Sequence, residues 1–237
     1  MSDRAVILAG GRGTRLRPYT VVLPKPLMPI GEYPILEVVV RQLAQKGFGH
    51  ITIAVNHQAN LIQAFFQDGE KWNVKIDYSM ESIPLSTIAP LTLISDLPEH
   101  FLLMNGDVLT DLDVRALYEQ HVAEGRLFTI AASSREQTTD YGVLHANAKS
   151  HLVGFEEKPV SRYLVSMGLY MVSKSILKFI PPGRKYGFDE LMLDLLAKGE
   201  KVHVHTHKGY WLDIGRPDDY MKAIDDFETG RSSFLLP

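Results

Sequence analysis

Apolar runs of strand length alternate with helix-like patterns in the first half of the chain. Runs rich in Val, Ile and Leu predict buried strands over Arg4–Ala9, Ile51–Val55, Val74–Tyr78 and Phe101–Asn105. Apolar residues that recur at steps of three and four predict helices over Pro34–Lys46, Asn60–Gln67 and Val114–Glu124. This alternation is typical of a mostly parallel sheet covered by helices on both faces.

The second half has more strands and fewer intervening helices. The predicted strands are Leu127–Ala132, Gly142–His145, Leu152–Glu156, Leu164–Val172 and Val202–Thr206, and the predicted helices are Phe188–Lys198 and residues 217–228. Strands that follow one another without helices favour antiparallel additions to the sheet. No repeat or low-complexity linker divides the chain, so we predict one α/β domain over residues 1–237 with a Rossmann-like, mostly parallel sheet.

Composition and charge narrow the class of protein. With 25 basic against 28 acidic side chains, the net charge is −3, which argues against a protein that grips long nucleic acid through its phosphates. The absence of cysteine excludes disulfide scaffolds, thiolate metal sites and cysteine nucleophiles. The first apolar stretch is too short for a signal peptide, and no uncharged run approaches the roughly 18–20 residues of a membrane span. We therefore expect a cytoplasmic protein that does not enter a membrane.

A glycine- and arginine-rich loop follows the first predicted strand. It reads Leu8-Ala9-Gly10-Gly11-Arg12-Gly13-Thr14-Arg15-Leu16-Arg17-Pro18, and Pro24-Lys25-Pro26 comes after it. Glycines after a buried strand let backbone N–H groups approach an anion with no Cβ in the way. Arg15 and Arg17 offer guanidinium groups that match phosphate oxygens, and Lys25 is a point charge between two prolines. Together these residues predict a cradle for a triphosphate.

Two common glycine codes do not fit this loop. A dinucleotide fingerprint counted from Gly11 and Gly13 needs glycine where Leu16 stands, and a P-loop counted from Gly10 needs Gly-Lys where Arg15-Leu16 stand. The alternative for an isolated glycine loop is a solvated surface turn. The Pro-Lys-Pro segment weighs against that alternative.

The combined pattern resembles the sugar-phosphate nucleotidyltransferases, also called nucleotide-sugar pyrophosphorylases. Their sequence Leu-Ala-Gly-Gly-x-Gly-Thr-Arg-Leu-x-Pro, followed by Thr and Pro-Lys-Pro, is matched by Leu8–Pro18, Thr20 and Pro24–Pro26. The chain is most similar to the branch of mannose-1-phosphate, heptose-phosphate and hexosamine-phosphate guanylyltransferases. This resemblance implies a glycosyltransferase-A-like nucleotidyltransferase fold. It also implies that the triphosphate is bound by Leu8, Ala9, Gly10, Gly11, Gly13, Thr14, Arg15 and Lys25.

Two aspartates follow predicted strands. Asp107 comes directly after the strand Phe101–Asn105, at the edge of a parallel sheet where ligand crevices form, and Asp213 lies in Trp211-Leu212-Asp213-Ile214-Gly215. From the residues alone, either aspartate is also suited to cap a loop or helix. In the resembled family, Gly-Asp and the later Trp-x-Asp-x-Gly supply two metal-binding aspartates. The resemblance therefore implies that Asp107 and Asp213 hold one Mg²⁺, with Asp107 also at the nucleotide.

A second charged cluster, Glu157-Lys158-Pro159, follows the predicted strand Leu152–Glu156. Charge clusters at strand ends are usually only solvated. The family's Glu-Lys-Pro contacts sugar hydroxyls and neutralises a second phosphate, and its Tyr-Gly-Val segment meets the sugar. The resemblance thus implies that the sugar phosphate is bound by Gly106, Tyr141, Gly142, Glu157, Lys158 and Gly168.

The segment Glu81–Pro90 departs from the family pattern Glu-x-x-Pro-Leu-Gly-Thr-Ala-Gly-Ala, which packs against the nucleoside. Ser86 and Ala89 stand where the family has glycine, so a Cβ lies where the base would approach the backbone. Because Glu81, Pro84 and Thr87 match, we expect these three residues to contact the base. The preference for guanine comes only from the similar branch.

Three histidines, His203, His205 and His207, alternate along a predicted strand and share one face. Three imidazoles are able to bind zinc, but without a partner carboxylate a solvent-exposed strand edge is the favoured interpretation.

The resemblance implies a reaction between a nucleoside triphosphate, GTP by preference, and a mannose-, heptose- or hexosamine-type sugar 1-phosphate. Its products are a nucleotide sugar and pyrophosphate. The implied catalytic residues are Arg15, Lys25, Asp107, Lys158 and Asp213. Residues of about 1–110 would bind the nucleotide and those of about 111–228 the sugar phosphate, in a monomer or homodimer. Because no repeat follows residue 230, we do not expect the left-handed β-helix domain that some members of the family carry.

Two alternatives remain open. One is a catalytically weak nucleotide-sugar sensor or regulatory subunit, suggested by the altered segment at residues 86–90. The other is a cytidylyltransferase that acts on phosphocholine or a polyol phosphate.

Overall fold

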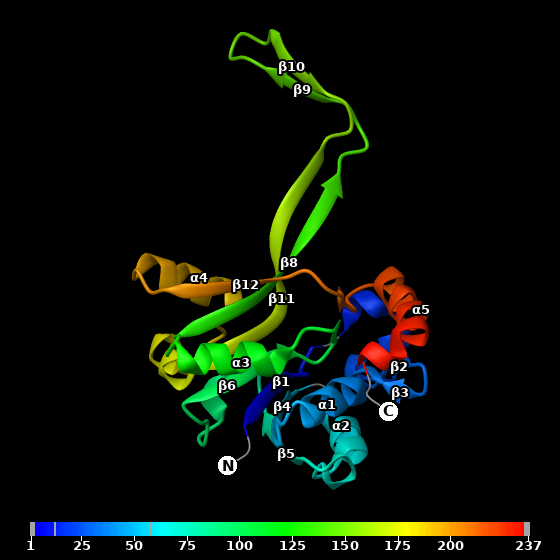
Figure 1. Cartoon of the computed structure of the whole chain (residues 1–237), viewed down its shortest axis with the longest axis vertical. Coiled ribbons are helices and arrows are strands. Elements are labelled where there is room, and N and C mark those ends of the chain that lie inside the picture. Colours follow the sequence, from blue (N-terminus) through cyan, green and yellow to red (C-terminus); the bar gives the residue numbers. More distant parts are fainter. Residues whose placement is uncertain (1–2, 12, 57, 235–237) are drawn as a thin grey trace.

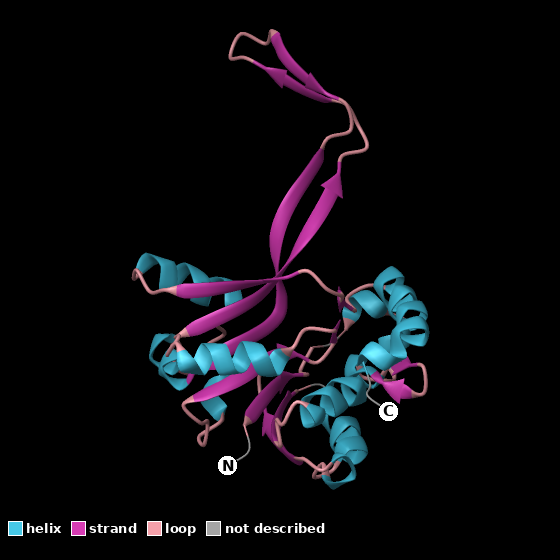
Figure 2. Cartoon of the chain, viewed as in Figure 1, coloured by secondary structure: helices cyan, strands magenta, loops and turns pink. Residues whose placement is uncertain are grey.

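The computed structural model describes residues 3–11, 13–56 and 58–234, without the side chains of residues 231–233, and is built on one large sheet (Figures 1 and 2). Seven strands lie in the order β12-β8-β11-β6-β1-β4-β5. Their bounds are β1 (Arg4–Leu8), β4 (His50–Val55), β5 (Lys75–Met80), β6 (His100–Asn105), β8 (Phe128–Thr138), β11 (Val160–Ser173) and β12 (Val202–His207). Strands β1, β4, β5 and β6 pair in parallel, as do β8 and β12, whereas β11 is antiparallel to both β6 and β8. The predicted mostly parallel α/β sheet is confirmed.

Helices cover both faces of this sheet. The α-helices are α1 (Ile35–Gln45), α2 (Ala59–Phe66), α3 (Val114–Ala123), α4 (Phe188–Ala197) and α5 (Pro217–Phe234). Short 3-10 helices are η1 (Thr14–Leu16), η2 (Tyr19–Val21), η3 (Lys25–Leu27), η4 (Glu70–Trp72), η5 (Ala89–Leu93) and η6 (Lys174–Phe179). Most predicted elements lie within a few residues of these bounds, while the 3-10 helices were not predicted because segments this short carry no periodic pattern.

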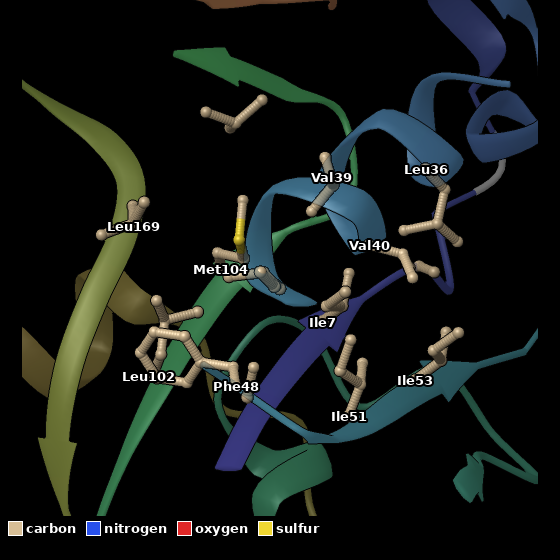
Figure 3. Packing of buried hydrophobic residues seen from close by; sticks show 14 of the residues in the cluster. Ile7, Leu36, Val39, Val40, Phe48, Ile51, Ile53, Leu102, Met104 and Leu169 are labelled. Carbon is tan, nitrogen blue, oxygen red and sulfur yellow. The ribbon is translucent and has the colours of Figure 1, made fainter. Parts of the chain in front are cut away.

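The alternation of side chains along β1 explains the two-sided core. Ile7 points into a cluster with α1, α2 and α3, whereas its neighbour Val6 points into a second cluster with η5, η6 and α4. Figure 3 shows the first cluster, where Leu36 and Val40 of α1 lie over Ile7 of β1. A strand buried on both faces reads as a continuous apolar run, as Ala5–Leu8 does.

A third cluster fixes the carboxyl edge of the sheet. Strand β7 (Val108–Thr110) follows β6 and pairs antiparallel with β13 (Trp211–Asp213), while β2 (Pro29–Ile30) pairs with β3 (Tyr33–Pro34). Leu109, Leu212 and Ile214 pack with Tyr220 and Phe227 of α5. This packing holds the segment after β13 beside the segment after β6, although about a hundred residues separate them in the sequence.

Two strands extend far beyond the sheet. Ser133–Thr138 of β8 stays paired with Val160–Val165 of β11, and the ribbon continues into a hairpin of β9 (Val143–Ala146) and β10 (Leu152–Glu156). We call residues 133–165 the arm; it projects away from the body in Figure 1. The strands predicted at 142–145 and 152–156 therefore pair antiparallel with each other, outside the large sheet.

Candidate active site

A cleft of about 500 Å³ opens at the carboxyl edge of β1, β4 and β6. This is the volume of a pocket for a small ligand, at the edge of the sheet where ligands bind in open α/β folds. Every residue predicted at the nucleotide lines it: Leu8, Ala9, Gly10, Gly11, Gly13, Thr14, Arg15, Lys25, Glu81, Pro84, Thr87 and Asp107. The structure thus brings together residues that are spread over a hundred positions of the sequence.

The glycine loop is held closed by Thr20. Gly13 has φ 59°, and its carbonyl oxygen accepts a hydrogen bond of 2.7 Å from Thr20 Oγ1. A Cβ at Gly13 would lie 2.9 Å from Thr20 Cγ2 and 3.2 Å from the Cβ of Lys25. Both the backbone conformation and the lack of space therefore require glycine here.

Lys25 lies between the loop and the end of β6. It opens η3 after Pro24, and its Nζ forms an ion pair with Oδ2 of Asp107. The side chains of Lys25 and Asp107 are only 13% and 17% exposed, so this pair is largely shielded from water. An ammonium group and a carboxylate are thereby fixed on the wall of the cleft.

Asp213 lies beside this pair. Pairing of β13 with β7 places Asp213 opposite Val108, and the N–H of Ile214 donates a 3.2 Å hydrogen bond to the carbonyl oxygen of Asp107. Burial and the nearby Asp107 carboxylate raise the pKa of Asp213, while Lys25 and Arg15 act in the opposite direction. Asp213 thus lies near Asp107 and the cations of the loop, although among these residues only Asp107, Lys25 and Arg15 line the cleft.

The donor set fits a magnesium ion that is shared with phosphate. Two carboxylates lie together at Asp107 and Asp213, and their mutual repulsion is what a divalent cation would remove. No group of three or more His, Cys, Asp or Glu side chains suited to a metal exists within the described ranges. Mg²⁺ in proteins is commonly held by one or two carboxylates with the remaining ligands from substrate phosphates and water.

Glu81 lines the cleft next to Gly10. Its Oε2 accepts a 2.9 Å hydrogen bond from the N–H of Leu85, and a Cβ at Gly10 would lie 3.0 Å from its Oε1. Burial raises the pKa of Glu81, and the bond from Leu85 partly offsets this shift. Glu81 therefore abuts the glycine loop, and its predicted contact with the base stays a prediction.

Ser86, in the segment that departs from the family pattern, also lines the cleft. Its φ is 74°, in the left-handed region that disfavours residues with a Cβ. The chain thus retains the glycine-like backbone conformation although the residue is serine.

Several lining residues were missed by the sequence analysis. They are Pro26, Asn56, Ser86, Asn105 and Gly215. Asn56 follows β4, as Asp107 follows β6, and its Nδ2 donates a 3.2 Å hydrogen bond to the carbonyl oxygen of Glu81. The rule that polar residues at carboxyl strand ends meet at one edge would have identified Asn56 and Asn105.

Two of the residues predicted at the sugar phosphate lie at the cleft. Gly106 lines it. Gly168 has φ 72°, and a Cβ there would lie 2.6 Å from Nδ2 of Asn105, so Gly168 packs directly behind the lining. These two glycines mark the side of the cleft from which β11 enters the arm.

The other four, Tyr141, Gly142, Glu157 and Lys158, lie on the arm and do not line the cleft of the same chain. Lys158 precedes Gly168 by ten residues, which places it about 30 Å away along an extended strand. The expectation that these residues share one site with Asp107 inside a single chain is therefore not met by this conformation. The physical reason is the β8–β11 ladder, which continues straight past the sheet edge.

The three alternating histidines lie on β12, the edge strand of the sheet. His207 Nε2 is 2.8 Å from Oδ1 of Asp111, and no cluster of three metal-binding side chains forms in the described part of the chain. The expectation that this face is exposed is wrong, because the three histidines are partly buried while Val204 and Thr206 between them face solvent.

The fold and the cleft define an α/β protein whose glycine loop and Lys25–Asp107 ion pair line one cleft at the carboxyl edge of the sheet. Residues 4–230 match the family model of the nucleotidyl transferases, and the chain belongs to this family. It is 35% identical to a mannose-1-phosphate guanyltransferase of Schizosaccharomyces pombe over 92% of this chain and 62% of that protein. It is 31% identical to a UTP–glucose-1-phosphate uridylyltransferase of Synechocystis over 93% of this chain and 62% of that protein. The chain thus spans about three fifths of the length of these relatives.

Solved structures give the same result for the fold. HddC from Yersinia pseudotuberculosis matches with a TM-score of 0.73 at 29% identity, over 96% of this chain and all of that one. HddC has also been crystallised with GMP-PN. A glucose-1-phosphate thymidylyltransferase from Bacillus anthracis, described as putative, matches with a TM-score of 0.76 at 23% identity, over 94% of each chain. In the part of our chain that is described, no helix is both long and apolar enough to cross a membrane.

Proposed function

We propose that this protein transfers a nucleotidyl group from a nucleoside triphosphate to a sugar 1-phosphate, giving a nucleotide sugar and pyrophosphate. The observation that carries the proposal is the meeting of the glycine loop and the Lys25–Asp107 pair at one cleft, with Asp213 just behind the lining and near enough to feel the charge of Asp107. The names of the relatives support the same reaction, since each describes a sugar 1-phosphate nucleotidyltransferase.

The chemistry needs no covalent intermediate. An oxygen of the sugar phosphate attacks the α-phosphorus in line, a new P–O bond forms, and the bond to the β-phosphate oxygen breaks. Pyrophosphate leaves with the electron pair of that bond. Positioning and charge stabilisation dominate such phosphoryl chemistry, so the chain has to hold two polyanions together.

The lining residues provide this charge stabilisation. Backbone N–H groups of the glycine loop and the Arg15 guanidinium would bind the β- and γ-phosphates. Lys25, already held by Asp107, would offset charge that grows on the α-phosphate. Behind Lys25, Asp107 and Asp213 would hold Mg²⁺, which would supply positive charge that offsets the repulsion between the two phosphate-bearing substrates.

For the finer choices we propose GTP as the donor and a mannose-, heptose- or hexosamine-type phosphate as the acceptor. Relatives named as mannose-1-phosphate guanyltransferases support guanine, while the uridylyltransferase relative shows that nearby sequences use other bases. The nucleotide would occupy residues of about 1–110, which supply all the lining residues of the cleft except Gly215. The sugar phosphate would be held by residues of about 111–228, from the side of Gly168.

A matrix of pyrophosphate-release assays tests the proposal. Common nucleoside triphosphates are combined with mannose, glucose, glucosamine and heptose 1-phosphates, each with and without Mg²⁺. We expect turnover that requires Mg²⁺ and is abolished by Asp107→Asn but unaffected by Asp225→Asn, the same change at an exposed position on α5. Binding of nucleotides in calorimetry without any turnover would show that the protein is a sensor and not an enzyme. Turnover only with CTP and phosphocholine or a polyol phosphate would replace the sugar acceptor.

A further inference from the structure

The arm exposes many apolar side chains to solvent. Eight of its large apolar side chains are 52–78% exposed: Tyr141, Leu144, Leu152, Val153, Phe155, Val160, Tyr163 and Leu164. A two-stranded hairpin on its own is only marginally stable in water. Clustered exposed apolar side chains of this kind mark a surface that binds another surface.

The hairpin at the tip has one polar and one apolar face. Leu144 lies opposite Phe155 and Ala146 opposite Leu152, so these four side chains share a face. The other face carries His145, whose Nε2 is 2.8 Å from Oε1 of Glu156. Such two-sidedness is expected of a hairpin that covers its apolar face with a partner.

Lys158 lies at the joint between the hairpin and the ribbon, in an unusual backbone conformation. Its φ is 44°, and the following residue is Pro159, whose carbonyl oxygen accepts a 3.0 Å hydrogen bond from the N–H of Thr139. Strained non-glycine residues concentrate at functional sites. On the arm, Lys158 shares this left-handed conformation only with Ser150 among the described non-glycine residues, and the observation is independent of the resemblance.

The cleft, in turn, is short of positive charge. Among its described lining residues the cations are Arg15 and Lys25, and Lys25 is already paired with Asp107. A triphosphate and a sugar phosphate together carry several negative charges. A further cation is therefore needed on the side of Gly168, where β11 leaves the body.

The arm of the same chain is poorly placed to supply that cation. In this structure the ladder of Ser133–Thr138 with Val160–Val165 carries the arm away from its own cleft, and the arm would reach that cleft only by bending at the register shift between Ser166 and Tyr170. A second copy can receive the arm in the conformation seen here. The rim of the cleft offers an apolar side chain for such docking, since Ile83 adjoins Pro84 of the lining and is 55% exposed.

We infer that two copies of the chain exchange their arms, so that Lys158 and Glu157 of each copy complete the cleft of the other. Each chain carries both the incomplete cleft and the missing cation, and a two-fold axis then satisfies both clefts at once. In this dimer the apolar face of the hairpin is buried on the partner, and Lys158 neutralises the sugar phosphate. The catalytic part of this inference rests on the proposed function.

Mixing two inactive variants tests the exchange directly. A Lys25→Ala chain and a Lys158→Ala chain, with different affinity tags, are co-expressed and the doubly tagged dimer is purified. With exchanged arms, one cleft combines the intact body with the intact arm, so we expect about half of the wild-type activity. With arms in their own clefts, each cleft carries one lesion and the mixed dimer stays inactive.

The matched control mixes Lys25→Ala with Asp213→Asn. Both changes lie in the body, so each cleft of that dimer keeps one lesion and we expect no recovery. Recovery in the control as well, an inactive Lys25→Ala and Lys158→Ala dimer, or a monomeric wild type by light scattering would each overturn the exchange.

A second measurement does not depend on turnover. The chain has no cysteine, so Lys158→Cys in one chain and Ser86→Cys in the other, treated with a short bis-maleimide, report only their own proximity. We expect a cross-link between chains of the mixed dimer, and none when Lys178→Cys, in η6 and outside the cleft lining, replaces Ser86→Cys. A cross-link together with no turnover by the wild type would refute the proposed function but support the exchange of arms. Turnover by the wild type without a cross-link would support the function and refute the exchange.

Discussion

The cleft and the arm lie at the same edge of one sheet, yet their side chains differ in burial and in bonding. In the cleft, polar groups are half-buried and bonded to one another, as Lys25 is to Asp107 and Glu81 to the N–H of Leu85. On the arm, apolar groups are exposed, with Phe155 at 58% and Leu144 at 66%. A cluster of hydrogen-bonded polar groups is suited to bind a charged ligand, whereas an exposed apolar hairpin is suited to pack against a protein surface.

The largest effect is expected at the Lys25–Asp107 ion pair of the cleft. Lys25→Ala removes the ammonium group beside the reacting phosphate, and we expect turnover to fall at least about 1000-fold. The matched change Lys178→Ala, at a lysine whose Nζ lies 4.8 Å from the Phe179 ring, should leave turnover unchanged. Pyrophosphate release checks both variants, and circular dichroism confirms that each is folded. Comparable losses in the two would show that charge at the cleft is not the cause.

Asp213→Asn is expected to separate activity from stability. Because burial and Asp107 raise the pKa of Asp213, the folded state holds its proton more tightly than the unfolded state, whose reference pKa is 3.8. The ionised carboxylate therefore costs stability above the raised pKa, and its removal should stabilise the protein at pH 8. This gain should fade as the pH falls through the raised pKa of Asp213.

Urea unfolding across this pH range measures the gain, and pyrophosphate release should show a loss of activity in the same variant. Asp225→Asn, on the exposed face of α5, serves as the control and should change neither quantity. A variant that is less stable than the wild type at pH 8 would contradict the assigned repulsion between Asp213 and Asp107.

Much of the body could be predicted from the sequence, because its strands and helices are buried with clear periods. Val6 and Ile7 of β1, for example, are almost fully buried on opposite faces, and the apolar run that contains them predicts a strand. The glycine loop and Asp107 were predicted because both follow such strands. The nearness of Asp213 to Asp107 followed only from the resemblance, since the β7–β13 pairing joins segments with no local signal for each other.

The arm could not be predicted in the same way. Ser134–Thr138 and Val160–Leu164 are exposed on both faces, so no alternation of apolar and polar residues marks them as strands. Both β8 and β11 are consequently longer than expected. The direction of the arm depends on the register shift between Ser166 and Tyr170 around Gly168, and a sequence does not reveal such a shift.

A smaller effect is expected at the glycine loop. Gly13→Ala places a Cβ at φ 59°, 2.9 Å from Thr20 Cγ2, and we expect a loss of about 2 kcal/mol in the free energy of unfolding. Gly11→Ala is the matched control in the same loop, because its Cβ would meet nothing within 4 Å. Chemical denaturation measures both. Equal losses in the two variants would show that the conformation of Gly13 is not the cause of the loss.

The smallest effect on the fold of the body is expected on the arm. Replacing Leu144 and Phe155 together by serine removes a cross-strand apolar pair that touches solvent, so the body should lose less than about 0.5 kcal/mol. Light scattering should nevertheless show dissociation, because the same pair is buried only in the exchanged dimer. His145→Ser, on the polar face of the hairpin, should leave the dimer intact. A large drop in thermal stability with an unchanged dimer would mean that the arm packs on its own body, which would remove the distinction between the two regions.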